Sequence, residues 1–276
     1  MTSNKNGTLT CVGVGITLGA HLTPIARSHI EQADVVFSLG NTGLMKQWLL
    51  GINSNIIDLQ SYYQQGKPRS LSYQQMQHAL LEPVRAGKKV VAAFYGHPGV
   101  FVTPSHKAIA QAKEEGYQAK MLPGISAEDC LIADCGIDPG RTGSASFEAS
   151  QFIRYRKQID TSAYLLLWQV SVIGDTRLTK FATDKEYRAL LIEVLQRNYP
   201  DDHPIIIYQA ATIATEQPRI EHIPLHHLLD VKLYPESTLV VTPIYKMRKD
   251  EIIEKRLLSL DKSKLKQSLT SITNDS

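Results

Sequence analysis

The chain has 276 residues, of which 43% are hydrophobic and 21% charged, and this composition excludes a disordered or fibrous protein. Its formal net charge is +3, and residues 246–276 account for that excess, with eight Lys or Arg against five Asp or Glu. The rest of the chain is neutral, which argues against a nucleic-acid-binding protein, because such proteins gather basic side chains on one face. Tyrosine is overrepresented, with 12 Tyr against 6 Phe and 2 Trp.

The termini and the cysteines indicate a cytoplasmic protein. No apolar run follows a basic start, as a signal peptide requires, and no apolar stretch is long enough to span a membrane. An odd count of three Cys fits a reducing compartment better than a disulfide framework. Cys130 and Cys135 lack a second pair or a His at zinc-finger spacing, so no metal site is expected.

Strand-like and helical segments alternate in the first half of the chain. Apolar runs predict strands at 9–14, 35–37, 55–59, 89–95 and 117–122, and periodic segments predict helices at 24–33, 42–50, 70–86 and 104–115. Ser72 and Gln75 form a candidate capping pair for the third helix. This alternation predicts an α/β fold with a mainly parallel sheet.

A second series follows Pro123 and Gly124. It predicts helices at 125–133, 184–199 and 246–260, the last with a frayed end, and strands at 144–149, 164–168, 205–208, 219–223 and 238–241, partly paired as hairpins. We therefore expect an N-terminal αβα domain over 1–123, a C-terminal αβα domain over 124–245 and a charged helix with a tail over 246–276.

Two glycine-bearing turns are candidate ligand contacts. Gly13, Gly15 and Gly19 follow the first strand, but the third glycine stands one position too late for a dinucleotide fingerprint. A tight turn that needs positive φ explains them equally well. Residues 95–101 follow the most apolar strand, at the carboxyl end, where open α/β sheets bind ligands.

A polar segment before the third helix contains Tyr63, Arg69 and Tyr73. Arg69 and Tyr73 are four residues apart and share one helix face if the helix begins early. Gly66 would allow the chain to fold Tyr63 back toward them. The alternative is that all three are surface residues of a solvated loop.

Five ordered segments within about residues 8–244 resemble the tetrapyrrole-methylase-type, or class III, S-adenosylmethionine-dependent methyltransferases. They are Val12-Gly-Val-Gly-Ile-Thr-Leu-Gly-Ala-His-Leu-Thr23, Tyr95-Gly-His-Pro98, Pro123-Gly-Ile-Ser-Ala127, Trp168-Gln169 and Gln209-Ala-Ala-Thr212. The resemblance implies two αβα domains with S-adenosylmethionine bound in the cleft between them, S-adenosylhomocysteine as the product and no metal. The cofactor contacts that it implies are Ile16, Tyr95, His97, Val100, Phe101, Ser126, Ala127, Gln169 and Ala211.

Two positions differ from the usual family pattern, and they indicate a particular subfamily. Ile16 replaces the family's usual Pro, and His97 replaces its Asp. The Tyr-Gly-His-Pro-Gly segment and the spacing of Tyr63, Arg69 and Tyr73 resemble the borosin peptide backbone α-N-methyltransferases. The chemistry of a phenol and a charged guanidinium motivates the hypothesis that Tyr73 is the base or proton relay, Arg69 stabilises negative charge and Tyr63 orients the amide carbonyl.

Borosin systems carry the acceptor peptide either at the enzyme's own C-terminus or on a separate precursor. Residues 246–276 are charged and then rich in Ser, Thr and Lys, unlike an apolar acceptor segment. We therefore expect a separate precursor peptide as substrate and, from the resemblance, a homodimer. The alternatives are a tetrapyrrole or RNA nucleoside methyltransferase of the same fold, or an inactive cofactor-binding regulatory module.

Overall fold

The computed structural model of the chain describes residues 6–40, 43–175, 179–180 and 182–274, with side chains up to residue 264. Thr42, which was expected to begin a helix, lies outside this part. The first half contains β1 (Thr8–Gly13), α1 (Pro24–Glu31), β2 (Val35–Leu39), α2 (Gly43–Leu50), β3 (Ile56–Asp58), η1 (Leu59–Tyr62), α3 (Arg69–Arg85), β4 (Lys89–Phe94), α4 (Thr103–Glu114) and β5 (Gln118–Leu122).

These strands form one parallel sheet in the order β3-β2-β4-β1-β5. Side chains alternate between its faces, so Leu9 and Cys11 pack with α3 and α4, whereas Val12 packs with α1 and α2. Both faces are covered, which explains why the central strands β1 and β4 are almost continuously apolar.

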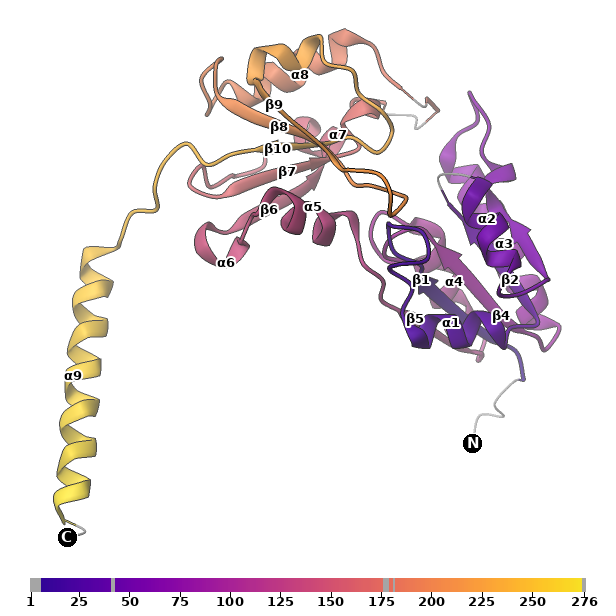
Figure 1. Cartoon of the computed structure of the whole chain (residues 1–276), viewed down its shortest axis with the longest axis horizontal. Coiled ribbons are helices and arrows are strands. Elements are labelled where there is room, and N and C mark those ends of the chain that lie inside the picture. The colour runs from indigo at the N-terminus through magenta and orange to yellow at the C-terminus, as the bar shows by residue number, and fades with distance from the viewer. Residues whose placement is uncertain (1–5, 41–42, 176–178, 181, 275–276) are drawn as a thin grey trace.

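The second half contains α5 (Ala127–Cys135), α6 (Pro139–Thr142), β6 (Ser144–Glu148), α7 (Ala149–Arg154), β7 (Tyr164–Trp168), η2 (Val170–Val172), α8 (Lys185–Leu195), β8 (Pro204–Gln209), β9 (Arg219–Pro224), η3 (Leu225–Leu229) and β10 (Thr238–Val241). Its sheet has the order β6-β7-β10-β8-β9, in which only β6 and β7 are parallel. α7 and α8 cover one face and α5 covers the other (Figure 1). The expected fold of two αβα units is therefore confirmed.

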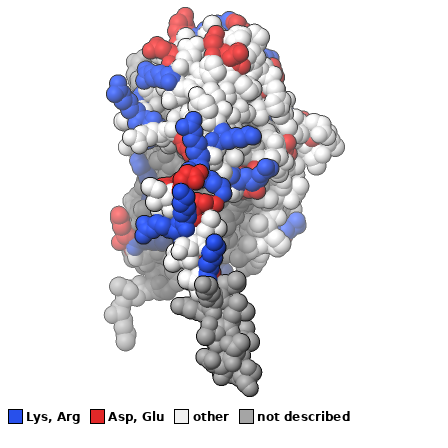
Figure 2. All heavy atoms as spheres, turned by 90° about the vertical axis from the view of Figure 1, so that its left-hand side faces the viewer, with Lys and Arg blue, Asp and Glu red and all other residues white. Residues whose placement is uncertain are grey.

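The C-terminal helix α9 (Glu251–Asn274) stands apart from both sheets (Figure 1). It is longer than the expected helix over 246–260, and its second half is helical where a frayed end was expected. Figure 2 faces the side on which α9 stands, and basic side chains gather in the middle of that view with a few acidic ones between them. Ile252 and Leu257 keep 72% and 52% of their surface exposed, so nothing in the described chain covers these apolar side chains.

The expected capping pair at the start of α3 is wrong. The helix begins at Arg69 after Pro68, without a side-chain cap. Ser72 lies inside the helix, where it is buried and its hydroxyl donates to the Tyr62 carbonyl at 2.9 Å. Ser72 thus joins α3 to the preceding segment and does not cap the helix. Among the described residues, no helix combines the length and apolar character needed to cross a membrane.

Candidate cofactor cavity and tyrosine–arginine group

Three glycine-bearing turns meet at one edge of the parallel sheet. They follow β4, β1 and β5, which are neighbours in the sheet, so their carboxyl ends lie side by side. Gly15 and Gly96 exchange backbone hydrogen bonds of 3.2 and 2.9 Å. A Cβ at Gly124 would lie 2.6 Å from the Gly96 oxygen and 2.7 Å from the Gly13 Cα. Glycine is required here because the three backbones approach more closely than any side chain allows.

Side-chain contacts hold the first turn in place. Gly15 has a φ of 77°, and the His21 ring nitrogen Nδ1 accepts from the amides of Ile16 and Thr17 at 3.3 and 3.1 Å. The turn is also tied to the second domain, since the Thr17 hydroxyl donates to the Ala211 carbonyl at 3.0 Å. No sequence motif marks this role of His21, because its ring accepts hydrogen bonds from backbone amides of its own turn.

The second turn leads into α4 through a conformation that is rare for a side-chain-bearing residue. Phe101 has a φ of 56°, and its ring lies 6.2 Å from that of Trp168 across the two domains. Gln169, directly after Trp168, has a φ of 58°. Strained residues of this kind persist where the surrounding structure fixes them, and both of these line one cavity.

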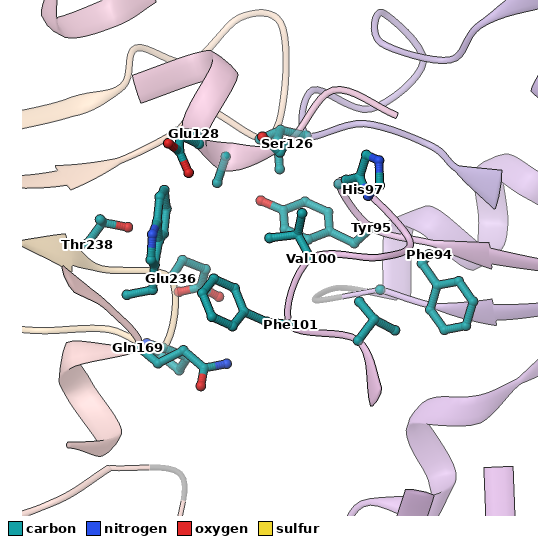
Figure 3. Close-up of a pocket in the computed structure, with 18 of the residues that line it drawn as sticks. Phe94, Tyr95, His97, Val100, Phe101, Ser126, Glu128, Gln169, Glu236 and Thr238 are labelled. Atoms are coloured by element: carbon teal, nitrogen blue, oxygen red, sulfur yellow. The ribbon is translucent and has the colours of Figure 1, made fainter. Parts of the chain in front are cut away.

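That cavity has a volume of about 350 Å³ and lies between the two domains (Figure 3). Eight of the nine residues expected to contact the cofactor line it, and the ninth, Ala211, adjoins the lining residue Ala210. The lining residues that the sequence did not single out are Leu39, Gly40, Gln60, Phe94, Val102, Glu128, Tyr208, Pro235, Glu236 and Thr238. Many of these are wall residues of strands or chain turns far apart in the sequence, so no local motif marks them.

Tyr95 and Ser126 show how the structure places two of the expected contacts. Ser126 caps α5 in a capping box, in which Asp129 accepts from the Ser126 amide and hydroxyl at 2.7 Å each. Burial raises the pKa of the Tyr95 phenol above its usual range, and the Glu236 carboxylate raises it further. Tyr95 therefore stays neutral at physiological pH.

Tyr63, Arg69 and Tyr73 lie together at the first-domain end of the cavity. The Tyr63 and Tyr73 rings are perpendicular with centroids 6.3 Å apart, and the Arg69 guanidinium carbon lies 6.0 Å from the Tyr63 centroid. α3 begins at Arg69, so Arg69 and Tyr73 lie one helical turn apart on the same face. This is the early helix start on which the predicted grouping depended. Of the three, Tyr63 lines the cavity itself.

The pKa of Tyr63 is raised well above the usual range of a phenol. Burial is the main cause, the neighbouring Tyr73 adds to it, and the Arg69 charge opposes it without reversing the direction. Tyr63 is therefore a neutral hydroxyl that donates or accepts hydrogen bonds at physiological pH.

A loop of the second domain touches this group. The Gly66 amide donates to the Thr179 carbonyl at 3.1 Å, and Arg69 Nη2 donates to the Lys180 carbonyl at 3.4 Å. The buried Asp175 carboxylate accepts from the Thr179 and Lys180 amides at 2.6 and 2.7 Å. This connection could not be predicted from the sequence, because it joins residues more than a hundred positions apart.

In the described part of the chain, no group of three or more His, Cys, Asp or Glu side chains could hold a metal ion. The arrangement is one cavity with a mostly apolar wall that also holds the Glu128 and Glu236 side chains, joined at one end to two phenols and a guanidinium. Such a site can bind an organic cofactor and polarise a group placed beside Tyr63.

Known proteins share both the sequence pattern and the fold of this chain. The sequence profile of the tetrapyrrole (corrin/porphyrin) methylases matches residues 8–227. The solved structure of the uroporphyrin-III-C-methyltransferase from Thermus thermophilus is similar, with a TM-score of 0.62 and 19% identity over 86% of this chain and 94% of that one. The structure of the cobalt precorrin-4 methyltransferase CbiF is also similar, with a TM-score of 0.61 and 16% identity over 85% of this chain and 94% of that one. At these identities the likeness shows the fold alone.

Other known proteins share a higher sequence identity with this chain. The methyltransferase/ribosomally synthesized cyclic peptide gymnopeptides precursor gymMA1 of Gymnopus fusipes is 44% identical over 232 residues, which are 84% of this chain and 55% of that protein. The methyltransferase/ribosomally synthesized type I borosin cyclic peptide precursor cmaMA of Coprinopsis marcescibilis is 42% identical over 241 residues, or 86% and 61%. This chain thus spans little more than half the length of these relatives. The resemblance to borosin methyltransferases is confirmed.

Proposed function

This chain belongs to the tetrapyrrole methylase family, and from that premise we propose that it is an S-adenosylmethionine-dependent methyltransferase of peptide backbone amides. The observation that carries the proposal is the position of Tyr63, which belongs both to the cavity wall and to the tyrosine–arginine group. A cofactor in the cavity and an amide beside Tyr63 would then be neighbours. The names of the relatives, which join a methyltransferase to a cyclic peptide precursor, support a peptide as the acceptor.

The cavity suits the cofactor in size and chemistry. Its volume of about 350 Å³ falls at the lower end of the range of small-molecule sites, and its wall is mostly apolar with a few polar groups. Ile16, Val100 and Phe101 would contact the apolar parts of the cofactor, while Ser126 and Gln169 offer polar contacts. When bound, S-adenosylmethionine supplies an electrophilic methyl group on its sulfonium.

The residues of the tyrosine–arginine group suit the acceptor. A peptide nitrogen is a poor nucleophile because its lone pair is delocalised into the carbonyl. Arg69 is always charged, so it can stabilise negative charge on the amide oxygen as the N–H proton leaves. We assign the removal or relay of that proton to Tyr73, and the neutral Tyr63 hydroxyl orients the carbonyl.

The substrate in this proposal is a separate precursor peptide, and the active form is a homodimer. Residues 246–276 are charged and therefore unlike an apolar acceptor segment, and the relatives are named as methyltransferase and precursor in one protein. The uncovered apolar side chains of α9 support a partner for that helix, either a second subunit or the precursor.

The test uses the purified chain, S-adenosylmethionine and synthetic peptides with apolar Val, Ile and Gly segments. We expect mass increments of one methyl group each, which fragmentation assigns to backbone nitrogens. Tyr73→Phe should lower the rate at least about a hundredfold, the low end of what a positioned proton-transfer group contributes, with cofactor affinity unchanged. Full activity of Tyr73→Phe would contradict the role assigned to Tyr73.

The same assay separates the alternative functions. Cofactor binding without methylation of any peptide would favour a regulatory module, and methylation of a tetrapyrrole or RNA instead would favour the other enzyme classes.

A further inference from the structure

The charged side chains that line the cofactor cavity are both acidic. Glu128 and Glu236 belong to its wall, and both lie at the second-domain end (Figure 3). No Lys or Arg is among the described residues that line it. A cavity with this wall is an environment of negative potential, because low-dielectric walls focus the field of the charges that line them.

Glu128 is held in position by its neighbours. It belongs to the first turn of α5, where Asp129 already serves as the capping carboxylate, so the Glu128 side chain is not needed for the cap. One Glu128 oxygen accepts from the Ser146 hydroxyl at 3.2 Å, and that hydroxyl accepts from the Trp168 indole at 2.6 Å. This chain of contacts fixes the carboxylate beside the Trp168 ring.

Glu236 lines the cavity from the segment that leads into β10. It precedes Ser237 and Thr238, which are buried at the start of β10, and the Ser237 hydroxyl accepts from the Tyr234 amide at 2.8 Å. Its charge acts across the cavity on Tyr95, whose phenol pKa it raises in addition to burial. None of the described basic side chains forms an ion pair with Glu128 or Glu236.

We infer that Glu128 and Glu236 make the cavity selective for the cationic cofactor over its neutral product. This inference rests on the proposed function. Methyl transfer forms a carbon–nitrogen bond and breaks the carbon–sulfur bond, the amide proton leaves the nitrogen, and the sulfonium becomes a neutral thioether. The product thus has one positive charge fewer than the cofactor. The two carboxylates bind the cofactor more tightly than the product and thereby favour exchange of spent for fresh cofactor.

A different role for the same residues predicts a different result. If the carboxylates only accepted hydrogen bonds from ribose hydroxyls, they would contribute equally to both ligands, because the ribose does not change in the reaction. The ratio of the two dissociation constants therefore separates charge selection from hydroxyl recognition.

The experiment measures dissociation constants of S-adenosylmethionine and S-adenosylhomocysteine by calorimetry for the full chain, Glu128→Gln, Glu236→Gln and the double variant. Glu114→Gln is the matched control, since it removes one carboxylate from the far end of α4. We expect the preference for the cation to fall about fivefold per carboxylate, as for charges interacting across a partly solvated cavity, and to remain constant in the control.

Equal changes for both ligands, or an unchanged ratio, would overturn the inference. Glu236 is exposed, so Glu236→Gln decides the matter alone if Glu128→Gln lowers the melting temperature. Failure of the unmodified chain to bind S-adenosylmethionine would instead count against the proposed function.

Discussion

Burial determines what the Tyr63 phenol can do. A surface tyrosine begins to ionise near pH 10, whereas the pKa of Tyr63 is raised because its charged form loses hydration in the cavity wall and faces Tyr73. Arg69 opposes this effect too weakly to make Tyr63 a base. The residue nearest to the cavity is thus suited to hydrogen bonding, which agrees with the orienting role proposed for it.

This yields a prediction for the alkaline titration. Ultraviolet difference spectra of the unmodified chain and Tyr63→Phe should show the same phenolate signal up to about pH 11, because Tyr63 remains protonated there while exposed tyrosines ionise. A smaller signal in Tyr63→Phe near pH 10 would contradict the raised pKa. Tyr155→Phe, which removes a tyrosine that is 56% exposed and lies outside the cavity lining, is the control for the loss of one phenol.

At the scale of elements, the three turns at the edge of the parallel sheet work as one unit. Their glycines are needed for the close approach of three backbones, so local turn preference is only part of the reason for them. A Cβ at position 124 would have to displace main chain on two other turns, and main chain cannot rotate away as a flexible side chain can.

We therefore expect Gly124→Ala to destabilise the fold by about 2 kcal/mol or more and to weaken cofactor binding, as substitutions that force backbone shifts do. Gly43→Ala is the matched control, because a Cβ there meets no atom within 4 Å. Thermal unfolding and cofactor titration would measure both effects. Equal melting temperatures of the two variants would show that the turns can separate without cost.

The loop around Asp175 is the second element with a predicted role. Its carboxylate binds two amides of the segment whose carbonyls accept from Gly66 and Arg69, so it sets the position of that segment against the tyrosine–arginine group. Asp175→Asn keeps the size but loses the charge-assisted hydrogen bonds, which are about twice as strong as neutral ones.

For Asp175→Asn we expect methyl transfer to slow about tenfold while the dissociation constant of S-adenosylmethionine stays constant, because the segment contacts Arg69 rather than the cavity. Kinetics at saturating peptide combined with calorimetry would separate the two effects. Asp175→Glu should restore part of the rate if the charge is what matters. An unchanged rate in Asp175→Asn would leave the loop without a part in catalysis.

At the scale of the whole molecule, α9 bears on the oligomeric state. Its described hydrogen bonds and ion pairs run within residues 249–263, and its apolar side chains are exposed. A helix of this kind adds little to the stability of the two sheets, and its apolar side chains need a partner to be buried.

We predict that removal of residues 251–276 leaves the melting temperature at low concentration nearly unchanged but shifts the sedimentation equilibrium toward monomer. Replacement of Leu257 and Leu258 by Ser in the full chain should act in the same direction, and replacement of Ser259 by Ala should not. A truncated chain that remains dimeric would place the subunit contact elsewhere.

The sequence alone determined the alternation of strands and helices, the glycine-bearing turns and the family resemblance, because these features depend on periodicity and on residues close together in the chain. It misplaced the cap of α3, since Ser72 donates its hydroxyl to a distant carbonyl instead of an amide of its own helix. Only the tertiary structure brought the turns after β1, β4 and β5 together, because strand order depends on pairing across the chain.

The same reason applies to the site. Tyr63, Arg69 and Tyr73 were singled out through the resemblance to borosin enzymes, but the raised pKa of Tyr63 depends on what buries it. Glu128 and Glu236 are 108 positions apart and belong to no common motif, yet they line one cavity. Residue types and local spacing indicate which chemistry is available, whereas burial and long-range contact decide which groups are charged and what they face.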